Sequence, residues 1–425
     1  MQARHGEPVL LGEASSWQPS GIGPAPSLRK EWMLGLRITD GPSNGCSRLT
    51  AMSRIRVAVL FGGRSGEHDV SCVSARHVAA AFDPDRYQVV PVAITRDGRW
   101  LLPEPSRRVL QGGRLEIPET AFEAAGEPVA LARGAAGAGL EVDVVFPVLH
   151  GPYGEDGTVQ GLLDMAGIPY VGSGVLGSAL GMDKEKMKRM FRDHGLPIGD
   201  FVAIRAHEWE EDAGYALEAA RSLGFPSFAK PANLGSSVGV SKCEDEASLV
   251  TGIEEALRHD RKVLVEEAMA GREIEVGVLG NDHPEASVPG EVFPGREFYD
   301  YAAKYLDDTS RTEIPAKLPP AVIRELQEFA VAAFRAVDAS GMARVDFFHE
   351  EAGRGPVLNE INTIPGFTVI SMFPKLWEAS GLPYPRLLDR LVELALERHR
   401  QRPRPEAVGA PWLEDQAVIG GRSDR

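Results

Sequence analysis

The sequence predicts an α/β (α+β) protein with three folded domains, and three observations lead to this expectation. At 425 residues the chain is longer than the roughly 100–200 residues of a typical domain. From Ile55 to about Gly181, short apolar runs that suit buried strands alternate with stretches of helical character, as in α/β domains. Beyond Met182, further strands and amphipathic helices follow in two blocks. We therefore expect domains at residues 54–181, 182–270 and 271–398.

Two tails flank these domains. Residues 1–53 are rich in Gly, Pro and Ser, residues 399–425 combine Pro with charge, and neither segment has a sustained period. We expect both to be disordered. Met52 stands just before the first convincing strand, Ile55–Phe61, which indicates that translation starts there and that the preceding segment is vestigial or a start-site artefact. A genuine N-terminal extension is the alternative.

Composition narrows the class of protein. A hydrophobic share of 43% and a charged share of 25% are ordinary for a globular protein. The formal net charge of −15 argues against non-specific binding to nucleic acid or to an anionic membrane. The three cysteines have no CxxC spacing, and no stretch approaches a membrane span or a signal peptide. We expect a cytoplasmic protein.

The first domain offers two candidate functional positions. The apolar run 142–149 predicts a buried strand that ends at His150, and ligands of such sheets bind beyond the carboxyl ends of strands. The Gly-rich turn 61–71 places Glu67 near the start of a helix. Glu67 either complements the helix dipole or holds the ammonium group of a substrate. The local sequence leaves both interpretations open.

Two common sequence motifs for nucleotide binding, the dinucleotide-binding GxGxxG motif and the P-loop, do not apply to this chain. Residues 172–177 match GxGxxG, but the motif comes late in its domain and no ribose-binding acid follows in a clean βαβ unit. A tight strand-to-helix turn is the better interpretation. The chain has no GxxxxGK[ST] loop, so it is not expected to be a P-loop NTPase.

The second domain contains a candidate phosphate site. A helix from Asp183, strands at 228–230 and 263–266 and a helix at 247–258 are predicted around the Gly/Ser loop 234–239. Glycines let backbone N–H groups approach an anion, and Lys230 at the end of the preceding strand can meet a phosphate. A plain hairpin turn is the alternative for this loop.

The third domain contains a polar, aromatic segment, which amphipathic helices follow. Residues 298–305 (FYDYAAKY) have the apolar periodicity of neither a helix nor a strand. We interpret them as a mobile loop that closes over a site and places Lys304 on phosphate. A solvated loop packed on its aromatic side chains is the alternative. A helix at 321–338 and a last helix with an apolar face are predicted by i/i+3/i+7 spacing, the latter through Leu387, Leu391 and Leu394.

The strongest functional signal lies in residues 343–366. Two short apolar strands joined by a Gly-rich turn carry one cation and three oxygen ligands: Arg344, Asp346, Glu360 and Asn362. Strand residues two apart face the same side, so these four side chains share a polar face. Val345, Phe347, Val357 and Ile361 are expected to face the core. Because Mg²⁺ takes carboxylate, amide, water and phosphate oxygens, the pattern indicates phosphoryl chemistry.

Seven segments together resemble the D-alanine–D-alanine ligases of the ATP-grasp superfamily over about residues 55–396. In order along the chain they are GGRSGEHDVS, HGPYGEDGTVQG, GSALGMDKEKMK, KPANLGSSVGV, FYDYAAKY, ARVDFF and NEINTIPGFT. The resemblance implies an ATP-grasp fold preceded by a Rossmann-like N-terminal domain. It also implies that ATP phosphorylates the carboxylate of one D-alanine, and that the amine of a second D-alanine then attacks the acyl phosphate.

The resemblance assigns the nucleotide and metal ligands residue by residue. Three lysines would clamp the phosphates of ATP: Lys184, Lys230 and Lys304. Glu266 and the backbone at Ala268 and Met269 would read adenine, with Glu273 at the ribose. Two Mg²⁺ (or Mn²⁺) ions would be held by Asp346, Glu360 and Asn362.

The same resemblance assigns the amino-acid site. Glu67 would bind the ammonium group of the first alanine with His150 nearby, while Ser236 and Tyr305 would link Glu67 to the closing loop. Arg344 and the Gly366 N–H would stabilise the oxyanion of the tetrahedral intermediate. Ser371 would take the carboxylate of the second alanine.

The tyrosine at position 305 implies a second D-alanine rather than D-serine or D-lactate. Two other functions were weighed. The first is another ATP-grasp carboxylate–amine ligase, which Glu67 and His150 disfavour. The second is a catalytically silent ATP-binding regulator, which the presence of Lys230, Arg344 and the three oxygen ligands disfavours. The family also implies a homodimer and a role in making peptidoglycan precursors.

Overall fold

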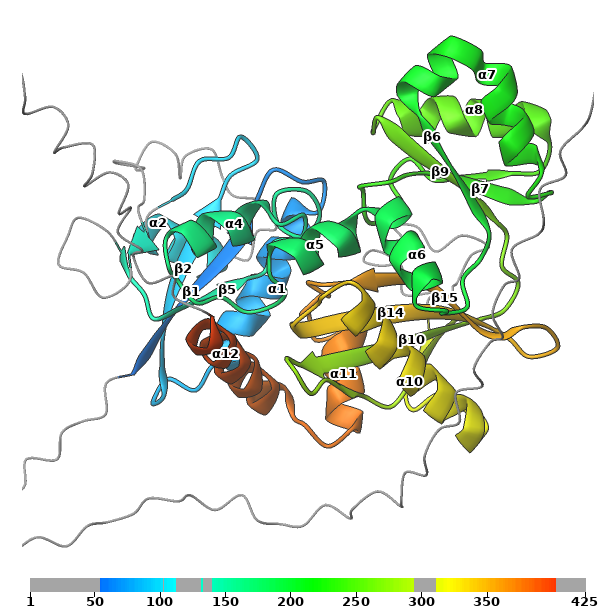
Figure 1. The fold of residues 1–425 in the computed structure, drawn as a ribbon. Helices are drawn as coiled ribbons and strands as arrows, with labels where there is room; N and C mark the ends of the chain where they lie inside the picture. Colours follow the sequence, from blue (N-terminus) through cyan, green and yellow to red (C-terminus); the bar gives the residue numbers. More distant parts are fainter. Residues whose placement is uncertain (1–53, 102, 112–130, 133–139, 294–310, 403–425) are drawn as a thin grey trace, which may run out of the picture. The chain divides into compact units, whose positions relative to one another are not determined.

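The computed structural model describes residues 54–101, 103–111, 131–132, 140–293 and 311–402. Residues 1–53 and 403–425 fall outside these ranges, as do residues 294–310, which include Lys304 and Tyr305. The predicted start of the C-terminal tail at 399 is wrong, because the helix α12 (Tyr384–Gln401) continues through residues 399–401. The described residues form three main sheets with helices packed on them (Figure 1). None of the helices in these ranges has both the length and the apolar character that crossing a membrane requires.

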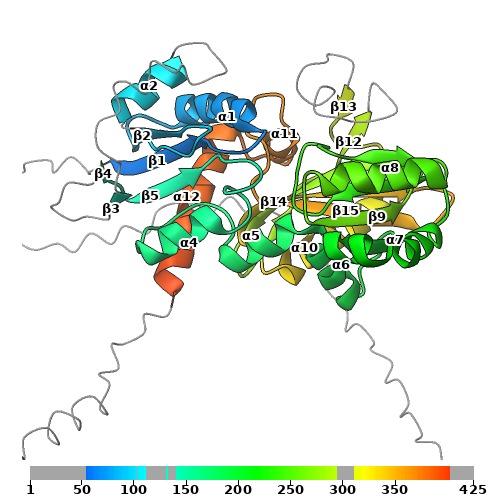
Figure 2. The ribbon, with the colours of Figure 1, turned by 90° about the horizontal axis from the view of Figure 1, so that it is seen from above.

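The first sheet is a three-stranded parallel sheet in the order β2–β1–β5. Its strands are β1 (Ile55–Gly62), β2 (Tyr87–Ile94) and β5 (Val144–Pro147). Alternation along β1 sends Val57 and Val59 to a core shared with α1 (His68–Ala81), and Ala58 and Leu60 to a core shared with α4 (Thr158–Met165). The two helices therefore cover opposite faces of the sheet (Figure 2).

Smaller elements complete this region: α2 (Pro103–Gln111), the parallel pair β3 (Leu131–Ala132) and β4 (Leu140–Glu141), and α5 (Val175–Met182). The glycines at 172–177 form a turn into α5, as predicted. Gly174 is the N-cap of that helix, and Tyr170 just before the turn bridges to Val145 of β5. Gly177 lies so close to the Asp338 carbonyl that an added Cβ would be 2.5 Å from its oxygen.

The second sheet is antiparallel, in the order β6–β9–β7–β8. Its strands are β6 (Phe201–Arg205), β9 (Lys262–Glu267), β7 (Ser227–Pro231) and β8 (Ser241–Cys243). Ala229, Val263 and Val265 share one core with α7 (Ala206–Arg221) and α8 (Glu246–Leu257), so both helices cover the same face (Figure 1). The alternate residues Lys230 and Glu266 therefore project from the other face.

The third sheet has six strands, with the path β13–β12–β10–β14–β15 and β11 paired to β10. The strands are β10 (Arg272–Gly280), β11 (Glu285–Ala286), β12 (Gly290–Phe293), β13 (Arg311–Glu313), β14 (Gly341–Glu350) and β15 (Gly355–Asn362). One face packs on α6 (Lys184–Asp193) and α10 (Pro320–Ala336) through Val276, Val345 and their neighbours. The helix predicted at 321–338 is confirmed as α10.

The register of β14 and β15 confirms the predicted polar face and corrects the predicted apolar one. Arg344 pairs with Asn362, and Asp346 pairs with Glu360. The register then shifts, so that Phe347 pairs with Leu358. A bulge adds one residue to a strand and reverses its alternation. As a result Leu358, rather than Val357, joins Ile361 in the core against α10, although Val357 is also buried.

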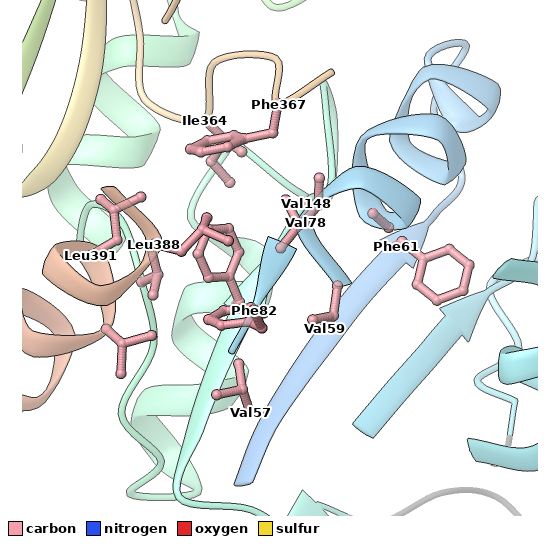
Figure 3. Packing of buried hydrophobic residues seen from close by; sticks show 14 of the residues in the cluster. Val57, Val59, Phe61, Val78, Phe82, Val148, Ile364, Phe367, Leu388 and Leu391 are labelled. Atoms are coloured by element: carbon pink, nitrogen blue, oxygen red, sulfur yellow. The ribbon is translucent and has the colours of Figure 1, made fainter. Parts of the chain in front are cut away.

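The largest hydrophobic core joins segments that are far apart in sequence (Figure 3). It contains Val57 and Val59 of β1, Leu388 and Leu391 of α12 (Tyr384–Gln401), and Phe367 from the segment between β15 and α11 (Met372–Ala379). The ring of Phe367 lies edge-on to that of Phe146, with centroids 5.6 Å apart. This packing fixes the chain after β15 against the first sheet.

Candidate active site

A cavity of about 690 Å³ brings together most of the predicted site residues. It lies between the polar faces of the second and third sheets and extends to the turn before α1 and the loop after β5. Fourteen predicted residues line it: Glu67, His150, Lys184, Lys230, Ser236, Glu266, Ala268, Met269, Glu273, Arg344, Asp346, Glu360, Asn362 and Gly366. Ser371 is described but does not line the cavity, while Lys304 and Tyr305 lie outside the described residues.

Glu67 is positioned by the Gly/Ser loop of the second sheet. Although it is the N-cap residue of α1, its side chain makes no capping hydrogen bond. Its carboxylate instead accepts a hydrogen bond from the Ser236 hydroxyl. Gly151 and Gly235 leave no room beside it, since an added Cβ would lie 2.9 Å and 3.0 Å, respectively, from Glu67 Oε2. These contacts favour the ligand-binding interpretation of Glu67 over the helix-dipole one.

The Gly/Ser loop also proves to be a hairpin connection, because it joins the antiparallel neighbours β7 and β8. Ser236 and Ser237 have φ of 50° and 58°, a left-handed conformation that non-glycine residues rarely adopt. Gly235, Ser236 and Ser237 line the cavity. Hairpin geometry and a ligand-facing position are therefore combined in one loop, rather than being alternatives.

His150 is buried at the edge of the cavity, with 6% of its surface exposed. Its Nδ1 lies 3.1 Å from the carbonyl oxygen of Ile364, so Nδ1 must carry a proton to make this hydrogen bond. Burial lowers the pKa of His150, although the nearby Glu67 carboxylate acts in the other direction. The neutral ring then leaves Nε2, which has no hydrogen-bond partner among the described residues, as an acceptor.

Buried charges line the side of the cavity formed by the second sheet. Glu266, 3% exposed, forms an ion pair of 2.7 Å with Lys230 and one of 3.6 Å with the fully buried Lys188 of α6. Burial opposes ionisation of Glu266, but the two ammonium groups outweigh it and lower its pKa. Glu266 thus remains ionised beside Lys230 on the cavity wall.

Lys184, the first residue of α6, reaches the cavity from the start of its helix. Its ammonium donates to the Leu234 carbonyl at 2.7 Å and lies 3.9 Å from Glu360. Burial lowers the pKa of Lys184, and Glu360 counteracts this effect. The helix start is fixed by Asp183, which caps α6 and forms an ion pair of 2.6 Å with Lys262.

The third sheet contributes a hydrogen-bonded polar cluster. Arg344 binds both oxygens of Asp346, at 2.7 Å and 2.6 Å, and its Nε also lies 3.1 Å from Glu275 of β10. Asn362 donates to Asp346 at 3.0 Å. Burial works against the charge of Arg344, but the carboxylates outweigh it and raise the pKa of Arg344. The pairing of Arg344 with Asn362 and of Asp346 with Glu360 places these groups side by side, on the shared polar face that alternation predicted.

The donor set of Asp346, Glu360 and Asn362 fits Mg²⁺ or Mn²⁺. It consists of two carboxylates and one amide that line the cavity together, and hard divalent cations prefer such oxygens. No group of three or more His, Cys, Asp or Glu in the described ranges is placed as a metal site. Two carboxylates and one amide fill only part of the coordination shell of such a cation, so the remaining positions would be left to phosphate and water.

Gly366 and Ser371 lie next to each other after β15. A Cβ on Gly366 would lie 2.9 Å from the Ser371 hydroxyl oxygen. That hydroxyl accepts from the Thr368 N–H at 3.0 Å and lies 2.8 Å from the Thr368 hydroxyl. Ser371 is also the N-cap residue of α11. The structure thus brings Gly366 and Ser371 together, but only Gly366 lines the cavity.

Sequence reasoning missed three ionisable residues near this site. Glu155 lines the cavity. Glu275 forms an ion pair with Arg344, and Lys188 forms one with Glu266. Two weak signals were present: Glu155 belongs to the motif that contains His150, and Glu275 lies two residues after Glu273. Lys188 ends the segment GSALGMDKEKMK, but its burial was not predicted, because a lysine one turn into an amphipathic helix is ordinarily exposed.

Two family models match the chain. The model described as D-ala D-ala ligase N-terminus matches residues 56–173, and the one described as D-ala D-ala ligase C-terminus matches residues 190–393. Proteins named D-alanine–D-alanine ligase are similar over nearly their whole length. The protein from Solibacter usitatus is 48% identical, covering 82% of this chain and 98% of its own. That from Streptomyces coelicolor is 51% identical, covering 81% and 93%.

Solved structures agree with these matches. The D-alanine–D-alanine ligase from Coxiella burnetii is 36% identical, with a TM-score of 0.71, covering 87% of this chain and 99% of its own. The VanG D-Ala:D-Ser ligase from Enterococcus faecalis is also 36% identical, with a TM-score of 0.70, covering 81% and 100%. These similarities, together with the cavity between the second and third sheets, show that the chain belongs to the D-alanine–D-alanine ligase family and has its ATP-grasp fold.

Proposed function

We propose that this protein joins two molecules of D-alanine in an ATP-dependent reaction and so supplies D-alanyl-D-alanine for peptidoglycan precursors. Family membership supports this activity. One structural observation supports it most strongly. A single cavity contains an acceptor site at Glu67, the cations Lys184 and Lys230, and the polar cluster of Arg344 and Asp346. These groups suit an amino acid, a polyphosphate and a reacting acyl group, respectively.

The first D-alanine binds at Glu67. Its ammonium group donates to the Glu67 carboxylate, which Ser236 orients, and to Nε2 of neutral His150. An acceptor nitrogen beside a carboxylate suits an ammonium group with three N–H donors. This arrangement leaves the carboxylate of the alanine free to react. Tyr305, which lies outside the described residues, is proposed to link Glu67 to the closing loop together with Ser236.

ATP binds between the second and third sheets. Lys184, Lys230 and Lys304 meet its phosphates, although Lys304 lies outside the described residues. Adenine is read by Glu266 and the backbone of Ala268 and Met269, and the ribose by Glu273; all four residues line the cavity. An oxygen of the D-alanine carboxylate attacks the γ-phosphorus of ATP. The bond between this phosphorus and the oxygen that bridges it to the β-phosphate breaks. ADP then departs, and the alanine remains as an acyl phosphate.

Asp346, Glu360 and Asn362 hold divalent cations. Two Mg²⁺ (or Mn²⁺) ions bound there would neutralise phosphate charge during the in-line transfer. In the structure Asp346 shares its oxygens with Arg344 and Asn362. Glu275 remains as a partner that can keep Arg344 in place when Asp346 turns toward a cation.

The second half-reaction takes place on the Arg344 side of the cavity. The deprotonated amine of the second D-alanine attacks the acyl carbon, and the oxygen of that carbonyl becomes negatively charged. Arg344 and the Gly366 N–H stabilise this oxyanion. The carbon–oxygen bond to phosphate then breaks and inorganic phosphate leaves. Ser371, next to Gly366, binds the carboxylate of the second alanine.

D-Alanine is proposed as the second substrate as well as the first, because a tyrosine occupies position 305. The alternative is D-serine, since a D-Ala:D-Ser ligase is 36% identical to this chain. An assay that offers D-alanine, D-serine and D-lactate together should give mainly D-alanyl-D-alanine. A dominant D-alanyl-D-serine product would instead identify D-serine as the second substrate.

We also propose that the enzyme works as a homodimer in the cytoplasm.

The first experiment measures phosphate release from ATP and Mg²⁺ with D-alanine, with L-alanine and with neither. Release that depends on D-alanine, together with a dipeptide identified by mass spectrometry, is the expected result. Release without any amino acid would indicate an ATPase. Release that depends only on another acceptor would indicate a different ATP-grasp ligase.

A further inference from the structure

Glu155 lies in the loop between β5 and α4, five residues after His150. Its side chain is half-buried and lines the same cavity as Glu67 and Lys184. Arg344 and Gly366 line this cavity as well, so Glu155 lies near groups proposed for both half-reactions.

The two carboxylate oxygens of Glu155 bind backbone groups of two separate segments. Oε2 accepts from the Gly151 N–H at 2.7 Å, and Oε1 accepts from the Ile364 N–H at 3.2 Å. Gly151 directly follows His150, and Ile364 precedes Gly366 by two residues. One carboxylate therefore bridges the loop that carries the first-substrate histidine and the segment that carries the oxyanion N–H.

Both polar groups of the Ile364 backbone are hydrogen-bonded. Its N–H donates to Glu155, while its carbonyl oxygen accepts from His150 Nδ1 at 3.1 Å. The Ile364 side chain is 2% exposed and belongs to the core that also contains Phe367 (Figure 3). The hydrophobic core thus holds the Ile364 side chain, while Glu155 and His150 bind the backbone of the same residue on the cavity side.

We propose that Glu155 is a positioning residue that sets the distance and orientation between His150 and the Gly366 N–H, and thereby between the first-substrate site and the oxyanion site. The inference rests on the proposed roles of His150 and Gly366. Glu155 need not touch either substrate. It acts by holding the two backbone segments that present these groups.

The neighbouring Asp156 provides a contrast within the same loop. Its oxygens accept from the N–H groups of Tyr153, at 2.8 Å, and Thr158, at 2.9 Å. The first contact stays inside the loop, and the second reaches only the first residue of α4. Asp156 therefore stabilises the loop itself, whereas Glu155 connects the loop to the chain after β15. A purely structural role for this loop would make the two residues equally sensitive to change.

The test compares Glu155→Gln with Asp156→Asn in the full-length enzyme. The glutamine amide nitrogen cannot accept a hydrogen bond, so one of the two N–H donors loses its partner whether or not Glu155 is ionised. We expect Glu155→Gln to raise the KM for the first D-alanine and to lower kcat, each at least tenfold. The Kd for ATP should stay within threefold of wild type, and Asp156→Asn should keep kcat and KM within threefold.

Three results would overturn the inference. Glu155→Gln could have the kcat and KM of wild type, or Asp156→Asn could change kcat and KM as much as Glu155→Gln does. The third is a Kd for ATP that rises in Glu155→Gln as much as the KM for the first D-alanine. If Glu155→Gln does not fold, Glu155→Asp takes its place. That side chain keeps the carboxyl group but is one methylene too short to span both donors. A smaller rise in KM and a smaller fall in kcat are therefore expected, and unchanged constants would overturn the inference. Wild-type enzyme that makes no dipeptide would instead overturn the proposed function, and this inference with it.

Discussion

The hydroxyl of Ser236 donates a hydrogen bond to the carboxylate of Glu67, across 169 residues of sequence. This contact joins the hairpin loop of the second sheet to the turn before α1. Glu67 is also confined by Gly151 and Gly235, whose missing side chains make room for its oxygens. The acceptor proposed for the substrate ammonium is therefore built from three segments, two that follow strands of the first sheet and one that joins strands of the second.

Ser236→Ala should weaken binding of the first D-alanine. A hydrogen bond to a charged group contributes about 1.5–3 kcal/mol, so we expect kcat/KM for D-alanine to fall roughly 10- to 100-fold. The Kd for ATP should change little. Ser237→Ala is the matched control, because both serines have left-handed backbone conformations and the substitution strains each in the same way. Equal losses in the two variants would point to the loop backbone instead of the Glu67 contact.

Glu360→Gln should impair cation binding. Replacing a carboxylate by an amide removes a negative ligand, so we expect a rate about a hundredfold lower or more. The Mg²⁺ concentration that gives half-maximal rate should also rise. Steady-state rates over a range of Mg²⁺ concentrations measure both effects. Glu325→Gln, an exposed change on α10, should leave the Mg²⁺ dependence unaltered. Normal turnover of Glu360→Gln would remove the metal role from this residue.

Gly366→Ala should affect the second substrate more than the first. The added Cβ would lie 2.9 Å from Ser371 Oγ, so the hydroxyl must move away from the Thr368 N–H that it now accepts from. We expect the KM for the second D-alanine to rise at least fivefold, with the KM for the first within about twofold of wild type. Initial rates over a wide range of D-alanine concentration separate the two constants.

The control for Gly366→Ala is Gly161→Ala in α4. There the nearest atom to an added Cβ is the Val175 side chain at 3.9 Å, and alanine favours a helix interior by roughly 0.5–1 kcal/mol. This variant should be slightly more stable and fully active. A larger change in the first KM than in the second for Gly366→Ala would contradict the assignment of Ser371.

Alternation along the chain was enough to predict the polar face of β14 and β15, because a strand places every second side chain on one side. It could not predict the bulge that moves Leu358 into the core, since a register shift depends on how the partner strand packs. The contact of Ser236 with Glu67 and the bond of Glu155 to the Ile364 N–H could not be predicted from the sequence pattern either. They join segments that are far apart in sequence and meet only when the sheets pack together.

The stability of the ligand-free protein should depend on pH through Glu155. Burial, supported by the nearby Glu67 carboxylate, raises the pKa of Glu155 from 4.5 to about 8. Below pH 4.5 the carboxyl group is protonated in both the folded and the unfolded chain, so it adds no pH dependence. Between pH 4.5 and about 8 the unfolded chain releases this proton and the folded chain keeps it. The free energy of unfolding therefore decreases as the pH rises through this window, and levels off above it.

Urea unfolding at pH 5 and pH 8 measures this dependence in wild type and in Glu155→Gln. The glutamine cannot ionise, so the variant should lose less stability than wild type between the two pH values. Asp156→Asn, for comparison, should lose as much as wild type. A Glu155→Gln variant with the same loss as wild type would show that Glu155 is already ionised in the folded protein at pH 5. In that case its two backbone hydrogen bonds, rather than burial, would dominate its pKa.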